Sequence, residues 1–351
     1  MNIHCDFIGG NITVTNQSGT DVYLENQIRD TTEDWFYWAF CVEGAQGQTI
    51  TFHMQQQNRV GYWGPAVSHD LKNWHRLDCA EGESFTYQFR DTETKVYFAH
   101  DMLYHPERFL NLAKELSLPV TELCKSRKGR SVPSVLIGNG RKNIILTARH
   151  HACEATGSYV LEGVLKEFLK NPMDDVKIFC VPFVDYDGVV EGDQGKARKP
   201  HDHNRDYLPE GSIYPETAAI WAYANQNGCH YGFDFHSPWH KSGENDNVFI
   251  VRNSVEKLEQ TKKFANILEQ QITPDAMQYS AENDHPPMTG WNQPNPNFGF
   301  TMMHRPECEL AFSLECTYFG TEENKVSIEK MIALGRCYAK AIKQYMQEKS
   351  I

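Results

Sequence analysis

Two histidines and a glutamate stand where a metal site can form. His151 and Glu154 directly follow an apolar run at residues 143–148, and they are three residues apart. That spacing puts two side chains on one face of a helical turn. His236 ends a second apolar run, which begins at residue 231. Catalytic zinc sites use three such protein ligands and leave one position for water, so the sequence predicts a metal-dependent hydrolase.

Each of these residues also has an ordinary explanation. A His and a Glu at a helix start can simply lie on the surface, because the helix dipole favours a carboxylate there. His236 can be a hydrogen-bonded histidine at a strand end. His150 is a rival ligand, but it lies three residues from Cys153 rather than from a glutamate. We therefore expect the zinc ligands to be His151, Glu154 and His236.

A polar segment at residues 200–207 contains Asp202, Asn204 and Arg205. An arginine beside an asparagine can hold a carboxylate through bidentate and amide hydrogen bonds. Asp202 can accept the free ring N–H of a ligand histidine. A polar loop rich in turn residues is the alternative explanation of this segment.

Glu315 is the candidate general base. Strand alternation over residues 309–315 puts Glu309 and Glu315 on one face and the apolar residues on the other. Glu315 ends a strongly apolar run, where a carboxylate is costly unless it is paired or functional. A partly buried carboxylate beside an activated water is what a general base requires. A strand-end Glu paired with Lys or Arg is the alternative, and Glu309 is the second candidate for the base.

The elements that must position these residues fall into two parts. Residues 1–105 contain short aromatic and β-branched segments separated by Gly, Asn and Asp, which predicts a small antiparallel β-sandwich domain. Residues 106–351 alternate strand-like and helical patterns, which predicts an α/β domain with a mixed, mostly parallel sheet and helices on both faces. Ligands bind beyond the carboxyl ends of such strands, where His151 and His236 fall.

The composition indicates which partners and which cellular compartment to expect. The formal charge is −12, and Lys and Arg form no cluster with interleaved aromatics, so we expect no nucleic-acid or membrane partner. No apolar run reaches bilayer length, and the first residues lack the features of a signal peptide. The ten cysteines are scattered without a Cys-x-x-Cys pair, so reduced thiols in a cytoplasm are expected. Nothing in these patterns indicates an oligomeric state.

In this order, the pieces resemble the zinc carboxypeptidase family, and most closely its cytosolic carboxypeptidase branch. That family has a zinc-binding His-x-x-Glu, an Asn-Arg pair after an Asp, a distant His and a catalytic Glu on a late strand. Residues 181–189 are similar to the family's Asn-Pro-Asp-Gly-Val stretch, with Asp185-Tyr186 in place of Asn-Pro. The similarity extends to the small β domain of that branch through residues 35–40, 58–65 and 96–100.

The resemblance implies a zinc-dependent, carboxypeptidase-like hydrolase that cleaves an amide bond next to a free carboxylate. A peptide or a small amide would be the substrate, Glu315 the catalytic base, and Asn204 and Arg205 the carboxylate anchor. Relatives of this fold that act on cell-wall peptides or acylated amino acids provide the alternative of a zinc amidase or deacylase. A catalytically inactive peptide-binding relative is the third hypothesis.

The chain departs from the family pattern at two places. Ala152 and Cys153 stand where the cytosolic branch usually has Pro-Gly. The family also has an arginine that polarises the scissile carbonyl, and counting without gaps puts Gly195 at that position. We expect Arg198 to take this role, because a guanidinium matches a developing oxyanion better than an ammonium does, with Lys196 as the alternative.

The resemblance also bears on the preferred substrate side chain. Cytosolic relatives favour acidic C-terminal residues, which requires a basic residue in the binding pocket. The candidates in this sequence are Lys241, Arg252 and Arg305.

Overall fold

The N-terminal part of the chain forms two β-sheets. In a computed structural model, which describes residues 1–349, the first sheet has the order β1 (Asn2–His4), β4 (Ala39–Glu43), β9 (Lys95–Ala99), β6 (Ala66–Ser68) and β7 (His75–Arg76). The second has the order β2 (Thr13–Ser18), β3 (Asp21–Glu25), β5 (Thr49–Met54) and β8 (Ser84–Gln88). Neighbouring strands are antiparallel except β3 and β5, which are parallel.

An aromatic core joins these two sheets. Phe40 and Phe98 of the first sheet pack on Phe52 of the second, with ring centroids 5.2 and 5.4 Å apart. All three rings are fully buried. Offset aromatic pairs of this kind add stability beyond the burial of their area. The predicted antiparallel β region at the N-terminus is confirmed, and its aromatic residues form its core.

One seven-stranded mixed sheet carries the rest of the fold. Its order is β10 (Val120–Lys125), β11 (Ser131–Ile137), β13 (Val176–Val181), β12 (Lys142–Ala148), β14 (Tyr231–His236), β16 (Leu310–Glu315) and β15 (Phe249–Val251). The four central strands, from β13 to β16, are parallel, whereas the outer pairs are antiparallel. The predicted mixed α/β architecture is confirmed, with its parallel part confined to the centre.

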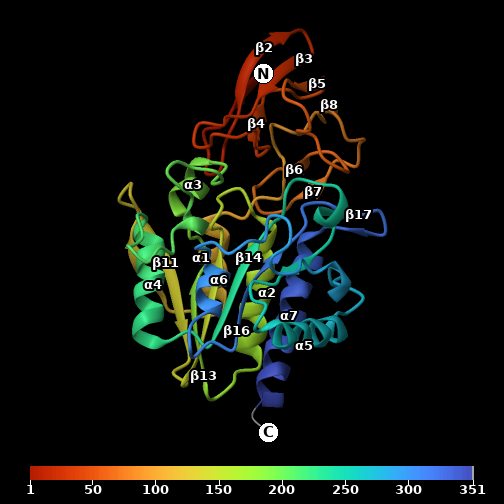
Figure 1. Ribbon diagram of the computed structural model, residues 1–351. Coiled ribbons are helices and arrows are strands. Elements are labelled where there is room, and N and C mark those ends of the chain that lie inside the picture. The colour runs from red at the N-terminus through yellow and green to blue at the C-terminus, as the bar shows by residue number, and fades with distance from the viewer. Residues whose placement is uncertain (350–351) are drawn as a thin grey trace.

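Helices cover both faces of this sheet (Figure 1). They are α1 (Pro106–Glu115), α2 (Thr156–Lys170), α4 (Pro215–Asn227), α5 (Leu258–Gln271), α6 (Phe298–Met303) and α7 (Ile328–Lys349), whereas the short α3 (Tyr186–Glu191) lies beside the N-terminal part. Phe233 of β14 packs on Phe264 of α5 and Tyr338 of α7. The preceding residue, Gly232, lies on the opposite face of the strand, where it is next to Phe298 of α6. Successive residues of β14 therefore contact helices on opposite faces of the sheet.

We propose a domain boundary between residues 105 and 106, where α1 begins. The two parts are in close contact, because one apolar core contains Tyr37 and Ala99 from the N-terminal part together with residues of the seven-stranded sheet. The N-terminal part lies at the end of the molecule opposite α7 (Figure 1).

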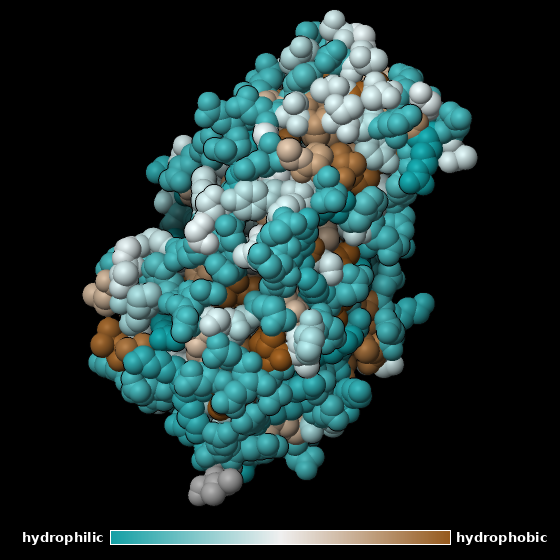
Figure 2. All heavy atoms as spheres, turned by 90° about the vertical axis from the view of Figure 1, so that its right-hand side faces the viewer, coloured by the Kyte–Doolittle hydropathy of each residue, from teal (hydrophilic) through white to brown (hydrophobic). Residues whose placement is uncertain are grey.

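The face of the molecule shown in Figure 2 is largely hydrophilic, with hydrophobic residues in small separate groups. A molecule of this size normally exposes scattered apolar residues of this kind. Within residues 1–349, none of the helices combines the length and the apolarity that a membrane crossing would need.

Candidate active site

The predicted site residues come from the carboxyl ends of neighbouring parallel strands. His151 and Glu154 lie in the loop between β12 and α2, whereas His236 is the last residue of β14 and Glu315 the last of β16. The pairing of β14 with β16 places His236 directly opposite Glu315. In an open α/β sheet, this edge is where ligands bind.

His151, Glu154 and His236 form a compact, buried group. Glu154 Oε1 lies 2.9 Å from His151 Nδ1, and Glu154 Oε2 lies 2.7 Å from His236 Nδ1. One ligand atom from each residue lies within 4.8 Å of the others. The structure thus brings together the three residues that the sequence analysis selected as metal ligands.

The chemistry of this group fits a zinc ion. Two imidazoles and one carboxylate are a ligand set of catalytic zinc sites. Glu154 is completely buried, which by itself raises its pKa, but His151, Lys196 and His236 together hold the pKa of Glu154 well below its usual range. The carboxyl group is therefore ionised, as a metal ligand must be.

A carboxylate also lies near the far nitrogen of each of the two histidines. Asp234 Oδ2 lies 2.5 Å from His236 Nε2, and Asp202 Oδ1 lies 3.7 Å from His151 Nε2. Metal-binding histidines commonly donate their second N–H to such a carboxylate, which fixes the tautomer and the ring orientation. Asp202 is thus on the side of His151 that its expected role requires.

His150, the rival ligand, lies behind this group. Its Nδ1 is 2.9 Å from Asp234 Oδ1, and its Nε2 is 2.7 Å from the hydroxyl of Tyr207. Asp234 also accepts a hydrogen bond of 2.8 Å from Thr147 Oγ1. His150, Asp234 and His236 form a second group of possible metal ligands. Both ring nitrogens of His150 are already engaged by the protein, so we regard His150 as a support for Asp234.

The first group opens into a cleft of about 340 Å³. His151 and His236 line the cleft, together with Lys196, Asn204, Arg205 and Glu315. Burial raises the pKa of Glu315, and its Oε2 has no hydrogen-bond partner among the described residues. An unpaired carboxylate of raised basicity beside a metal-ligand group is suited to accept a proton from water.

Lys196, rather than Arg198, reaches the metal-ligand group. Lys196 Nζ lies 2.5 Å from Glu154 Oε1 and 4.9 Å from the centroid of the Trp35 ring. The preceding residue, Gly195, has a φ of 76°, and a Cβ there would lie 2.1 Å from the backbone nitrogen of Ala152. The chain can pass this close to the loop of His151 only with glycine, which excludes an arginine at position 195.

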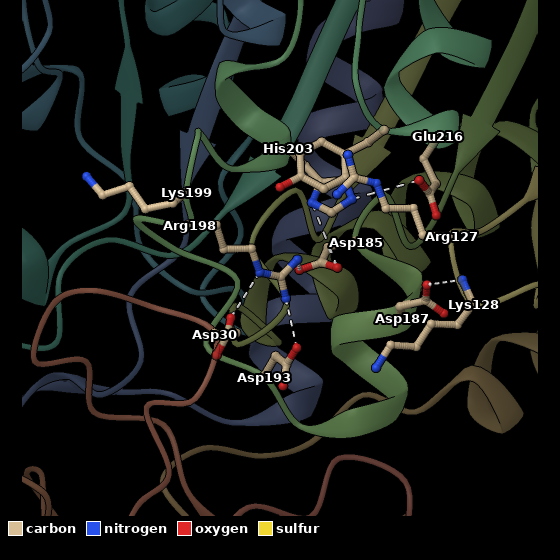
Figure 3. A pocket seen from close by; sticks show the side chains of 11 residues that line it. Asp30, Arg127, Lys128, Asp185, Asp187, Asp193, Arg198, Lys199, His203 and Glu216 are labelled. Atoms are coloured by element: carbon tan, nitrogen blue, oxygen red, sulfur yellow. Dashed lines mark hydrogen bonds and ion pairs between the residues drawn. The ribbon is translucent and has the colours of Figure 1, made fainter.

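The structure does not bring Arg198 into the cleft. Its guanidinium lies 3.0 Å from Asp30, 2.8 Å from Asp185 and 2.9 Å from Asp193, in a separate pocket (Figure 3). Because three carboxylates already surround this cation, it has no free N–H face to offer a substrate carbonyl. This corrects the expectation that Arg198 polarises the carbonyl, whereas the alternative, Lys196, lines the cleft.

Asn204 and Arg205 lie on η1 (His203–Arg205) and line the cleft as predicted for a carboxylate anchor. Arg205 Nη1 donates a 3.2 Å hydrogen bond to the carbonyl of Asn204. Within residues 1–349, no carboxylate forms an ion pair with Arg205. Its guanidinium is therefore free to bind an anionic group that enters the cleft.

The three basic residues considered for acidic substrates lie outside the cleft. Lys241 pairs with Glu81, Arg252 lies 2.8 Å from Asp284, and Arg305 lies 2.8 Å from Glu307.

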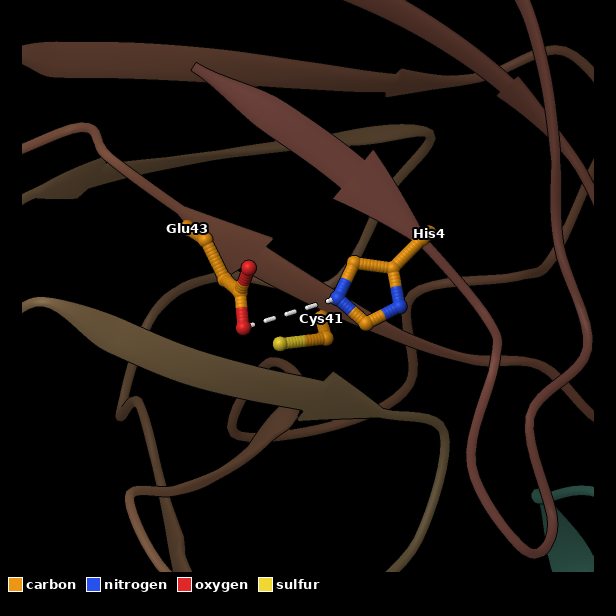
Figure 4. A group of neighbouring side chains, drawn as sticks. All are labelled: His4, Cys41 and Glu43. Atoms are coloured by element: carbon orange, nitrogen blue, oxygen red, sulfur yellow. Dashed lines mark ion pairs between the residues drawn. The ribbon is translucent and has the colours of Figure 1, made fainter.

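A third possible metal-ligand group lies in the N-terminal sheet. His4, Cys41 and Glu43 project from the paired strands β1 and β4 (Figure 4). Glu43 already pairs with Lys95 at 2.7 Å, and the backbone N–H of Asp6 donates to His4 Nδ1. A histidine that accepts at Nδ1 carries its proton on Nε2, the nitrogen that faces Glu43, so this arrangement is satisfied by the protein itself.

Asp234 was not among the predicted site residues, although the sequence carries a signal for it. Asp234 and His236 are two residues apart on β14, and strand alternation puts them on one face. Apart from Asn204, the asparagines that line the cleft, at positions 245, 253, 292, 295 and 297, carried no such signal. Most of them follow no regular strand or helix pattern, so only the folded chain brings them together.

Comparison with known proteins defines the class of fold and the relatives of this chain. Residues 3–100 match the cytosolic carboxypeptidase N-terminal domain family. Over 99% of the chain, the structure superposes on a metallo-carboxypeptidase from Pseudomonas aeruginosa in complex with (2-guanidinoethylmercapto)succinic acid, with a TM-score of 0.82, 21% identity and 100% of that chain covered. A metallo-carboxypeptidase from Burkholderia cenocepacia gives a TM-score of 0.80 at 17% identity, with 99% of each chain covered. The chain has the metallo-carboxypeptidase fold.

Comparison with curated protein sequences identifies relatives of this chain. An uncharacterized protein of Zymomonas mobilis is 27% identical over 258 residues, which cover 67% of each chain. Cytosolic carboxypeptidase 2 of Xenopus tropicalis is 28% identical over 169 residues, 39% of this chain and 17% of that protein. Cytosolic carboxypeptidase 3 of Mus musculus is 32% identical over 174 residues, 43% of this chain and 16% of that protein. The chain is homologous to cytosolic carboxypeptidases, and the match spans about a sixth of their length.

Proposed function

We propose that this protein is a zinc-dependent, carboxypeptidase-like hydrolase that cleaves an amide bond next to a free carboxylate. The single observation that carries the proposal is the convergence of His151, Glu154 and His236 on the floor of a cleft that Glu315 and Arg205 also line. The homology to cytosolic carboxypeptidases supports the same reaction class.

The three ligand residues would hold zinc, which supplies Lewis acidity and lowers the pKa of a bound water toward about 7. Glu315 accepts the proton of the attacking water and then delivers it to the leaving amine. The ammonium of Lys196 donates a hydrogen bond to the carbonyl oxygen as negative charge develops there. Arg205 and Asn204 bind the terminal carboxylate, which orients the scissile bond for attack.

We also propose a reducing compartment such as a cytoplasm. All ten cysteines are free thiols, and seven of them are buried in the apolar interior. Proteins of oxidising compartments more often pair their cysteines.

Metal analysis tests the proposed function. Wild-type protein should contain about one zinc per chain and release C-terminal residues from blocked peptides. His236→Ala should lose both the zinc and the activity, because it removes one of three ligands. The matched control is His4→Ala, which changes the donor group of the N-terminal sheet and should leave both unchanged. Wild-type protein that binds no zinc when zinc is supplied would refute the proposal.

Asp234 provides a graded test of the same site. We expect Asp234→Asn to weaken zinc binding by about 10- to 100-fold, because the amide no longer orients His236 through a charged hydrogen bond. Competition with a chelator of known affinity measures the change. Zinc affinity that stays at the wild-type value in folded Asp234→Asn would contradict this role.

A further inference from the structure

We propose that the cleft selects an uncharged C-terminal residue, preferably one with an amide or hydroxyl side chain, and rejects acidic and basic ones. This inference rests on the proposed function and adds the substrate class. It departs from an acidic preference, because the basic residues considered for that preference lie outside the cleft.

Neutral polar side chains continue directly from the general base and share the wall of the cleft with the rings of Trp35, Trp239 and Trp291. Ser313 precedes Glu315 by two residues on the same face of β16. The β15–β16 pairing sets Val251 opposite Ser313. The cleft also contains Asn253 and three asparagines of the segment that precedes α6, Asn292, Asn295 and Asn297.

In the proposed mechanism, every charged group in the cleft takes part in a step that is common to all peptide substrates with a free C-terminal carboxylate. The two ligand histidines and Glu315 serve the metal and the water. Lys196 is paired with Glu154. In the proposed mechanism it serves the scissile carbonyl, and Arg205 binds the terminal carboxylate. Among the residues that the structure describes, no other ionisable side chain lines the cleft. A side chain of the C-terminal residue therefore meets only neutral groups, whichever part of the wall it contacts.

A charged side chain would lose its water in this cleft without gaining a partner. Removing a carboxylate or an ammonium from water is costly unless an opposite charge replaces the lost hydration. Neutral amide and hydroxyl groups face no such penalty, because asparagine side chains both donate and accept hydrogen bonds.

Glutamine and glutamate provide the decisive comparison, because they are nearly isosteric and differ in charge. The zinc-loaded full chain is assayed on blocked peptides that are identical except for a C-terminal Gln, Glu, Lys or Leu. We expect kcat/KM for Gln to exceed that for Glu and for Lys by about tenfold or more, and Leu to fall between them. A Glu peptide cleaved as well as the Gln peptide, or better, overturns the inference.

Binding separates this inference from the proposed function. Calorimetry with the Glu315→Gln variant and the same peptides should give the same order of affinity without turnover. If no peptide is cleaved by the wild type, the proposed function fails, yet tighter binding of Gln than of Glu would still support a neutral cleft. Equal or tighter binding of Glu would overturn it.

A single added charge should redirect the selectivity. Asn253→Asp introduces a carboxylate of almost the same shape into the wall, so the ratio of kcat/KM for Lys to that for Gln should rise by about tenfold. Asn111→Asp, on the exposed face of α1, is the matched control and should leave the ratio unchanged. An unchanged ratio in folded Asn253→Asp overturns the inference, and the wild-type peptide series decides it if that variant does not fold.

Discussion

We expect the Glu315→Gln variant to bind zinc normally and to lose about 100- to 10,000-fold in kcat. Glutamine keeps the shape of the side chain but cannot accept a proton from water at neutral pH. Burial raises the pKa of Glu315, which makes the wild-type carboxylate a stronger base. Because the proton is transferred in the transition state, kcat and kcat/KM should fall together while KM changes little.

The matched control is Glu309→Gln, at the residue before β16. Glu309 precedes β16 at its opposite end and pairs with Lys349 at 3.2 Å, far from the cleft. It was the second candidate for the base, so this pair of variants decides between the two glutamates. Steady-state kinetics with one blocked peptide measures both. Near-normal kcat in zinc-loaded Glu315→Gln would assign the proton transfer to another group.

The ligand group of the candidate site could be selected from the sequence because its signals are local. His151 and Glu154 are three residues apart at the end of an apolar strand, and His236 ends another. Parallel strands deliver their carboxyl ends to one edge, so three local patterns were enough to place these residues together. The central strands were predictable for the same reason, since buried parallel strands read as continuous apolar runs.

The position of Arg198 could not be derived in this way. Its partner Asp30 is 168 residues away in the sequence, and no spacing rule connects the two. Counting along the chain also assumes a loop of fixed path, whereas the turn at Gly195 sends the next residue, Lys196, toward Glu154. The helix α3 was missed because its six residues show too little periodicity. The edge strand β10 was missed because it is largely exposed and has no apolar run.

The loop that carries Lys196 and Arg205 is attached to the N-terminal part of the chain. The N-terminal part holds this loop at several points. Asp30 accepts hydrogen bonds from the backbone N–H groups of Gln194 at 3.0 Å and Gly195 at 2.8 Å. The buried side chain of Gln194 both accepts from the backbone nitrogen of Tyr37 and donates to its carbonyl oxygen, each at 2.9 Å. The N-terminal part is therefore a support of the candidate site.

Arg198 neutralises the buried charge at this junction. Its guanidinium binds Asp30 of the N-terminal part together with Asp185 and Asp193. Burial, followed by the charge of Asp30, raises the pKa of Asp193 to about 6 even though Arg198 is present. Without Arg198, three carboxylates would remain close together with much less compensation.

We expect Arg198→Ala to lower the free energy of unfolding by about 3–5 kcal/mol, the usual cost of leaving a buried charge unpaired. Urea denaturation measures this change. The matched control is Arg141→Ala, which removes an arginine paired with Asp175 on the surface and should change stability little. At temperatures where Arg198→Ala remains folded, kcat/KM should also fall, because the loop no longer fixes Lys196 and Arg205. Stability equal to that of Arg141→Ala would contradict the junction role.

The loss in the free energy of unfolding caused by Arg198→Ala should be smaller at acidic pH. Burial already raises the pKa of Asp193 in the folded protein, and loss of the Arg198 guanidinium, which lowers that pKa, raises it further above its value in the unfolded chain. Groups with a raised folded pKa bind protons on folding, so the folded state gains stability as the pH falls through that pKa. The pKa of Asp193, about 6 in the wild type, marks the lower end of the pH range in which this gain occurs. The difference between variant and wild type should thus be smaller at pH ~5 than at pH ~8, and a constant difference would point to lost packing rather than lost charge.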